Sequence, residues 1–109
     1  MDPTAITAAE ALEMGTLGGA RALGRGQRLG SLETGKLADL IIVSMSKARQ
    51  QPLYDPVAQI VYASRGDDVA TTIVNGRVLM RDRKVLTLDE ATVLRDARAA
   101  ADLVRKAVQ

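Results

Sequence analysis

The dipeptide Asn75-Gly76 is the feature that most constrains the fold of this 109-residue chain. Asparagine and glycine both accept the positive φ angles of a two-residue type I′ turn, whose twist matches that of the strands it joins. β-branched and apolar residues flank the pair, as Thr72-Ile73-Val74 before it and Arg77-Val78-Leu79 after it. The sequence therefore predicts an antiparallel hairpin between Val69 and Met80.

Another strand is predicted over Leu37–Val43, whose β-branched end favours a buried, pleated setting. The polar residues 44–56 follow, and Pro52 and Pro56 within them indicate a loop. Residues 57–63 fit a short helix by the spacing of their apolar side chains and a short strand by their β-branched content. Periodicity alone leaves both open.

The first helix is predicted from Thr7, which forms a capping box with Glu10. Gly18 lies inside this helix and weakens it by about 1 kcal/mol against alanine, so the helix either breaks there or is reinforced by a close contact. Gly24 is well placed to end it, since glycine adopts the left-handed conformation of a helix C-terminus.

A second capping box, Thr87 with Glu90, predicts a long helix that runs to about Val108. An apolar stripe follows one face of this helix and requires a covering surface, for which an internal core contact is the default interpretation. The stripe consists of Leu94, Ala97, Ala101, Val104 and Val108.

The composition excludes several classes of site. The chain has no histidine and no cysteine, so it lacks the commonest metal ligand, the usual general base and any thiolate. Fifteen basic residues are scattered among thirteen acidic ones and the only aromatics are Tyr54 and Tyr62, which argues against a nucleic-acid partner. The longest apolar run, Leu37–Val43, is far shorter than the roughly 20 residues of a membrane span.

No group of polar residues forms a convincing site. Asp67-Asp68 and Asp89-Glu90 are expected to be solvated acids of a turn and a helix start, and Lys36 a solvated flank of a strand. Gly24, Gly26 and Gly30 lack the lysine and hydroxyl residue of a phosphate loop, and Ser46 and Ser64 have no histidine to activate them. Tyr54 and Arg65 are expected to serve packing or face solvent. We therefore expect no catalytic, cofactor-binding or metal-ligating residue in this chain.

The order of three groups of motifs resembles the amidohydrolase superfamily. Thr7-Ala8-Ala9-Glu10-Ala11-Leu12, with Gly19–Gly24, looks like the last helix of its barrel. The stretch Gly30–Ile41, of pattern Gly-Ser-Leu-Glu-x-Gly-Lys-x-Ala-Asp-Leu, is similar to the segment that enters its small β-domain. Pro52–Pro56, Tyr62–Gly66 and Val74–Arg77 resemble the branch of methylthioadenosine/S-adenosylhomocysteine deaminases and triazine chlorohydrolases.

The resemblance implies a (β/α)₈-barrel hydrolase in which a divalent metal, zinc or iron, activates water for attack on a ring carbon that bears an amino or chloro group. The family's metal ligands are histidines of earlier barrel strands and an aspartate, all upstream of this segment, and Asp2 is not that aspartate. A barrel takes about 250 residues. The segment is therefore expected to be non-catalytic by itself and to hold no cofactor of its own.

The expected fold is α+β, the C-terminal portion of a composite β-sandwich flanked by a barrel helix and a long C-terminal helix. It divides into the terminal barrel-type helix over residues 1–24, the C-terminal part of the small β-domain over 25–88, and the C-terminal helix over 89–109. The expected partner is the remainder of an amidohydrolase chain, or a second copy through open strand edges. A free-standing homo-oligomeric interaction module is the alternative. Because Met1, Asp2 and Pro3 do not begin a secretory signal, the expected location is the cytoplasm.

Overall fold

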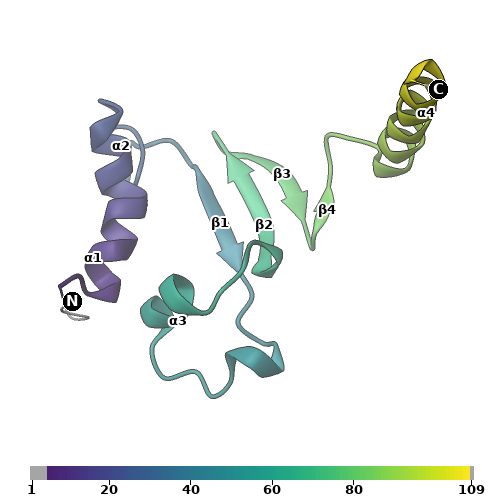
Figure 1. Ribbon diagram of the computed structural model, residues 1–109. Coiled ribbons are helices and arrows are strands. Elements are labelled where there is room, and N and C mark those ends of the chain that lie inside the picture. The colour runs from purple at the N-terminus through teal and green to yellow at the C-terminus, as the bar shows by residue number, and fades with distance from the viewer. Residues whose placement is uncertain (1–4, 109) are drawn as a thin grey trace.

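The computed structural model describes residues 5–108, so the expectations about Met1, Asp2 and Pro3 lie outside the described residues. A helical stretch comes first, then a strand, a long excursion, three further strands and a final helix (Figure 1). The predicted α+β class is confirmed as a four-stranded antiparallel sheet with helices.

The first helix is continuous and changes its winding at the glycines. Helix α1 (Ala8–Glu13) passes through a π-helical turn, η1 (Met14–Gly18), directly into α2 (Gly19–Ala22). The predicted capping box is confirmed, because Glu10 N donates to Thr7 Oγ1 over 3.3 Å and Thr7 N donates to Glu10 Oε2 over 2.7 Å. Gly24 ends the helical stretch at a φ of +67°, as predicted.

The predicted hairpin is confirmed, with β2 (Val69–Val74) and β3 (Arg77–Arg81) joined at Asn75 and Gly76. Both turn residues have positive φ, 49° and 75°, as a type I′ turn requires. A further strand, β4 (Lys84–Val85), pairs with β3 and was not predicted.

Strand β1 spans only Leu40–Val43, so the predicted start at Leu37 is three residues too early. The main chain of Leu37 is committed elsewhere, because its N–H donates to Arg28 O over 2.9 Å. Asp39 then holds the hairpin turn, accepting from Asn75 N at its Oδ1 over 2.5 Å. Because of these bonds, residues 37–39 stay outside the sheet and the strand begins at Leu40.

Residues 44–68 form an excursion between β1 and β2, here called the arm. It contains two 3₁₀ turns, η2 (Ala48–Gln50) and η3 (Gly66–Asp68), with helix α3 (Pro56–Tyr62) between them. The stretch 57–63, left open by periodicity, is thus mainly helical. Its cap explains why: Asp55 Oδ1 accepts from Val57 N over 2.8 Å, and Pro56 suits the first helical position.

Helix α4 spans Glu90–Val108 and extends away from the sheet (Figure 1). The predicted cap at Thr87 is wrong, since the helix begins at Glu90 and Asp89 lies at its start, accepting from Thr92 Oγ1 and Val93 N. The expected core contact of the stripe is also absent from the described residues. Leu94, Val104 and Val108 are exposed.

The strands lie in the order β1-β2-β3-β4, all antiparallel, so β1 and β4 are the edges. Within residues 5–108, only one apolar residue, Ala20, is buried. The accessible surface is 8600 Å², whereas a compact protein of 11.6 kDa exposes about 5,800 Å². The radius of gyration of 18.9 Å likewise exceeds the roughly 13 Å of a compact domain of this length. The elements are formed, but nothing among residues 5–108 covers their apolar surfaces.

Candidate functional site

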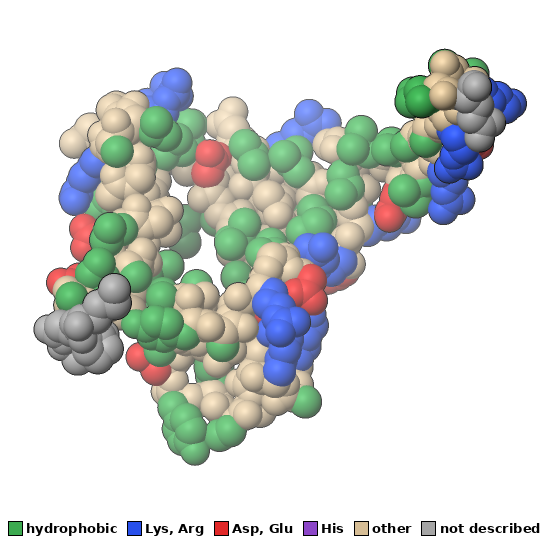
Figure 2. Space-filling view, viewed as in Figure 1, with side chains coloured by type: hydrophobic (Ala, Val, Ile, Leu, Met, Phe, Trp, Pro, Cys, Tyr) green, Lys and Arg blue, Asp and Glu red, His purple; other side chains and the backbone are tan. Residues whose placement is uncertain are grey.

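The most distinctive feature of the surface is uncovered aliphatic side chains on successive elements. Ile41 and Ile42 are neighbours on β1, and their side chains point to opposite faces of the sheet. They are 56% and 53% exposed, so neither face of the sheet is covered at this strand. Figure 2 shows hydrophobic side chains along the sheet and on the projecting helix.

A groove separates the first helical stretch from the sheet. Its volume is about 530 Å³, with Gly15, Thr16 and Ala20 on the helical wall and Leu40, Ile41 and Ile73 among the residues of the sheet wall. Because the two walls are largely apolar and the groove is empty of protein, it is a surface that a further piece of polypeptide can fill.

The best-organised polar group is an ion cluster at the base of the arm, here called the ionic clasp and formed by Lys47, Arg49, Asp67 and Asp68. Asp68 is only 1% exposed. Its Oδ1 accepts from Arg49 Nη2 over 2.5 Å and lies 3.0 Å from Lys47 Nζ, and its Oδ2 accepts from Arg65 N over 2.9 Å. The expectation that Asp68 is solvated is therefore wrong, whereas Asp67 is exposed as expected.

The clasp strongly favours the ionised carboxylate. The hydrogen bond from Arg49 is the main cause that holds the pKa of Asp68 well below its usual range, with smaller contributions from Arg65 N and Lys47. The bond from Lys47 likewise lowers the pKa of Asp67. Asp68 is thus an ionised partner of two cations and has no character of a general acid or base.

Lys36 is partly buried, contrary to the expectation of a solvated flank. Its side chain is 12% exposed. Its Nζ donates to Gly26 O over 2.9 Å and to Ser31 Oγ over 2.5 Å, and lies 3.2 Å from Glu33 Oε1. Lys36 therefore ties together the glycine-rich loop that follows the first helix, which is a structural role.

The residues of this chain do not fit a zinc or iron centre. Histidine and cysteine are absent from the sequence, and no three acidic side chains of residues 5–108 come together as a ligand set. The carboxylate of Asp68 is already occupied by its basic partners. Asp89 and Glu90 lie at the start of α4, where both are exposed.

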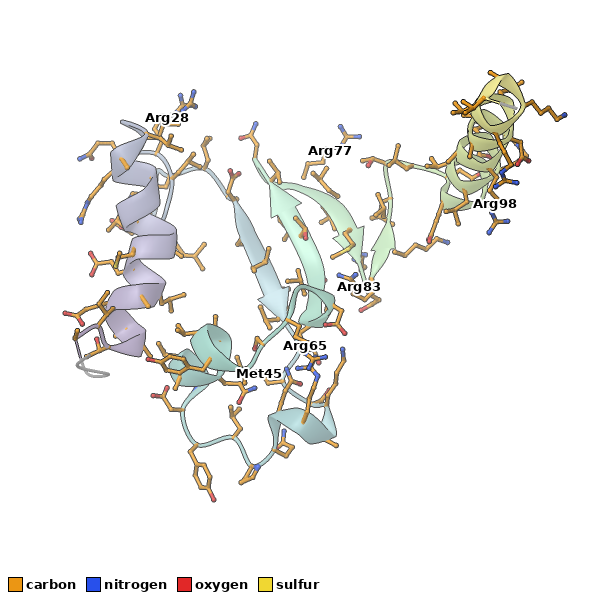
Figure 3. All side chains as sticks on the ribbon, viewed as in Figure 1. Arg28, Met45, Arg65, Arg77, Arg83 and Arg98 are labelled. Carbon is orange, nitrogen blue, oxygen red and sulfur yellow. The ribbon has the colours of Figure 1, made fainter. Side chains whose placement is uncertain are left out.

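The remaining side chains considered from the sequence lie apart from any reactive group. Tyr54 of the arm is 90% exposed, and Arg65 is exposed beside η3, where Figure 3 shows it near Arg83. Ser46 Oγ lies 3.0 Å from Ser44 Oγ, its partner among the described residues. Over residues 5–108 no helix is both long and apolar enough to traverse a bilayer.

Comparison with known proteins gives the family. Residues 1–79 match the Amidohydrolase family. The chain is 52% identical over 100 residues to a 5′-deoxyadenosine deaminase of Methanosarcina barkeri, covering 92% of this chain and 23% of that protein. It is 44% identical over 105 residues to a 5-methylthioadenosine/S-adenosylhomocysteine deaminase of Syntrophobacter fumaroxidans, covering 96% and 24%. The chain thus spans about a quarter of the length of these curated relatives.

Solved structures agree. An adenosine deaminase from Xanthomonas campestris with bound zinc superimposes with a TM-score of 0.86 and 40% identity, over 96% of this chain and 24% of that one. The atrazine chlorohydrolase of Arthrobacter aurescens, complexed with zinc, gives a TM-score of 0.75 and 29% identity, over 85% and 20%. These matches include both kinds of enzyme that the motifs resemble. The chain therefore belongs to the amidohydrolase family, on the branch that holds the methylthioadenosine/S-adenosylhomocysteine deaminases and the triazine chlorohydrolases.

Proposed function

We propose that this chain is the C-terminal part of a metal-dependent deaminase of adenosine-type nucleosides, to which it contributes structure and no catalytic residue. The observation that carries the proposal is the combination of uncovered aliphatic surface with a match to about a quarter of the length of deaminase relatives. A piece of a larger fold is expected to show open apolar faces of this kind.

The occupant of these faces is the rest of the amidohydrolase fold. The exposed surface exceeds that of a compact protein of this mass by roughly 2,800 Å², which lies within the range of obligate interfaces. The helical stretch α1–α2 is proposed as the last helix of a barrel, and the sheet as part of a composite β-sandwich. The groove between them then receives polypeptide from the missing part.

The chemistry belongs to that missing part. A divalent metal bound there by histidines would activate water for attack on the ring carbon that carries the amino group. This chain supplies none of those ligands, so its contribution is to close the barrel and support the loops around the site. The proposed setting is the cytoplasm.

A complementation experiment tests the proposal. The 109-residue chain is co-expressed with a fragment of the Methanosarcina barkeri 5′-deoxyadenosine deaminase that lacks the matched region, and ammonia release from 5′-deoxyadenosine is measured in the presence of zinc. We expect deamination from the pair and none from either piece alone. Only the pair contains the metal ligands of the deaminase fragment together with the surface that this chain supplies.

In the matched control, the same fragment is co-expressed with its own missing region as a separate polypeptide. Activity of this pair shows that splitting the protein is tolerated. If that control is active and the pair with the 109-residue chain is not, the proposal is wrong. Deamination by the 109-residue chain alone would also contradict it.

A further inference from the structure

The most deeply buried polar side chains among residues 5–108 are Asp68 of the ionic clasp and its neighbour Gln50. Gln50 and Asp68 are each 1% exposed, whereas Ala20 is the one apolar residue buried within that range. Buried polar groups are costly unless they are fully bonded, and these are. Gln50 Nε2 donates to Ser44 O over 2.9 Å and Gln50 Oε1 accepts from Lys47 N over 3.0 Å.

These bonds join the two ends of the arm. Ser44, directly after β1, donates its N–H to Asp68 O over 2.8 Å, and Asp68 directly precedes β2. Asp68 in turn holds Arg49 and Lys47 of the outgoing side of the arm. The arm is therefore closed at its base and leaves the sheet as one piece.

Arg49 extends this closure to α3. Its Nη2 bonds Asp68 while its Nη1 donates to Ala63 O, the carbonyl at the C-terminal end of α3, over 3.3 Å. A single guanidinium thus links the base of the arm to its helix. Guanidinium can hold two acceptors in fixed directions in this way because its donors form a rigid planar fork.

Helix α3 in turn packs against α1 and bridges the sheet and the first helical stretch at one end of the groove (Figure 1). The loop that contains Gly30 and Leu32 also lines the groove and joins the two walls. The position of α3 therefore sets how far apart the walls lie at its own end of the groove.

We infer that the ionic clasp is the positioning device that holds α3 against α1 and so fixes the first helical stretch relative to the sheet. Arg49 and Asp68 are its essential pair, and Lys47 supports it. The hairpin does not depend on the clasp, because its turn is held by Asp39 and its own ladder. Opening the clasp should loosen the helices relative to the sheet and leave the strands paired.

The distance between two spin labels tests this inference in the 109-residue chain itself. The chain has no cysteine, so Ala9→Cys on α1 and Arg77→Cys on β3 are unique label sites, and both positions are exposed. Labelled chain is diluted into excess unlabelled chain, so that only distances within one molecule are recorded even if chains associate. We expect a distance distribution that is clearly narrower in the unmodified chain than in Arg49→Met and Asp68→Asn, because the clasp acts locally and does not need a cooperative core.

The matched control is Arg81→Met, because Arg81 is an exposed arginine at the end of β3, remote in sequence from the clasp. It should keep the narrow peak, and so should the conservative Arg49→Lys, although more weakly. Circular dichroism verifies that each variant retains its helices and strands. If Arg49→Met loses its helices or strands, Lys47→Met, which removes only a supporting cation, is measured instead. A broadened peak in Lys47→Met supports the inference, and an unchanged peak contradicts it.

Two results would overturn the inference. One is a narrow peak that persists in Arg49→Met and Asp68→Asn with unchanged circular dichroism, which would show that α3 is held by other contacts. The other is a broad distribution in the unmodified clasp, which would show that the clasp fixes nothing. Neither result depends on deaminase activity, so it is distinguishable from failure of the proposed function.

Discussion

Replacing Gly30 with alanine is expected to destabilise the proposed complex of this chain with the rest of the amidohydrolase fold by roughly 3 kcal/mol. The loop residue Gly30 lies directly on the first helical stretch. A Cβ atom at this position would lie 2.7 Å from Leu17 Cα, 2.8 Å from Ala20 Cβ and 3.0 Å from Thr16 O. Two of these atoms belong to the helix backbone, which cannot yield as the end of a flexible side chain can.

Gly35→Ala provides the matched control. Gly30 and Gly35 have nearly the same positive φ, 88° and 90°, so alanine meets the same backbone strain at both positions. Nothing lies within 4 Å of a Cβ at Gly35, so its substitution should cost only about 1 kcal/mol. The measurement is the shift of the urea midpoint of the complex. Equal shifts for the two variants would show that the loop does not press on the helix as described.

The 109-residue chain, purified without its missing part, is expected to self-associate and to show no cooperative thermal unfolding as a monomer. Both edge strands, β1 and β4, carry unpaired main-chain groups, and strands of this kind pair readily with other chains. The uncovered side chains include Ile41 and Ile42 on β1 and Leu103 and Val104 on α4. The single buried apolar residue of the described part, Ala20, cannot supply the core that a cooperative monomer needs.

The mass of the species in solution is measured by light scattering over a range of concentrations, together with binding of a dye that fluoresces on apolar surface. We expect oligomers that grow with concentration and strong dye fluorescence. Addition of the missing amidohydrolase fragment should lower both signals, because the same surfaces become covered. A dye-negative monomer of 11.6 kDa that melts in one sharp transition would contradict this expectation.

Local signals in the sequence determined the elements whose bonds lie close along the chain. Asn75-Gly76 and the box of Thr7 with Glu10 each form within a few residues, and both are present in the structure. The cap at Thr87 failed although its local pattern was equally good, because the helix begins at Glu90, and Asp89 accepts from Thr92 Oγ1 and Val93 N. Residue spacing could not tell a helix start after Thr87 from one after Asp89.

Long-range bonds explain the other differences. The main-chain carbonyl of Arg28, nine residues earlier, accepts from the N–H of Leu37 and so shortens β1. The periodicity of apolar residues could not predict this bond. Asp68 is buried because Lys47 and Arg49, about twenty residues away, turn back to it. An acidic pair beside a glycine is equally typical of a solvated turn, so the sequence alone could not predict the ionic clasp.

The expectation that this chain carries no catalytic or metal-binding residue stays a prediction, and its physical basis is that a chain without histidine or cysteine cannot offer the usual zinc ligands. Assignment to the amidohydrolase family depended on the order of motifs, and the match over residues 1–79 now shows it. Neither periodicity nor composition could have indicated the deaminase branch.

The intact mass of the native polypeptide, in cells that express it, tests the central claim most directly. An antibody against residues of this chain, followed by intact mass spectrometry of the captured protein, gives the result without any assumption about activity. Because the chain spans about a quarter of its deaminase relatives, we predict a polypeptide about four times heavier than 11.6 kDa, or a stable complex of this chain with a second polypeptide that supplies the difference. A species of 11.6 kDa with no such partner would contradict the account.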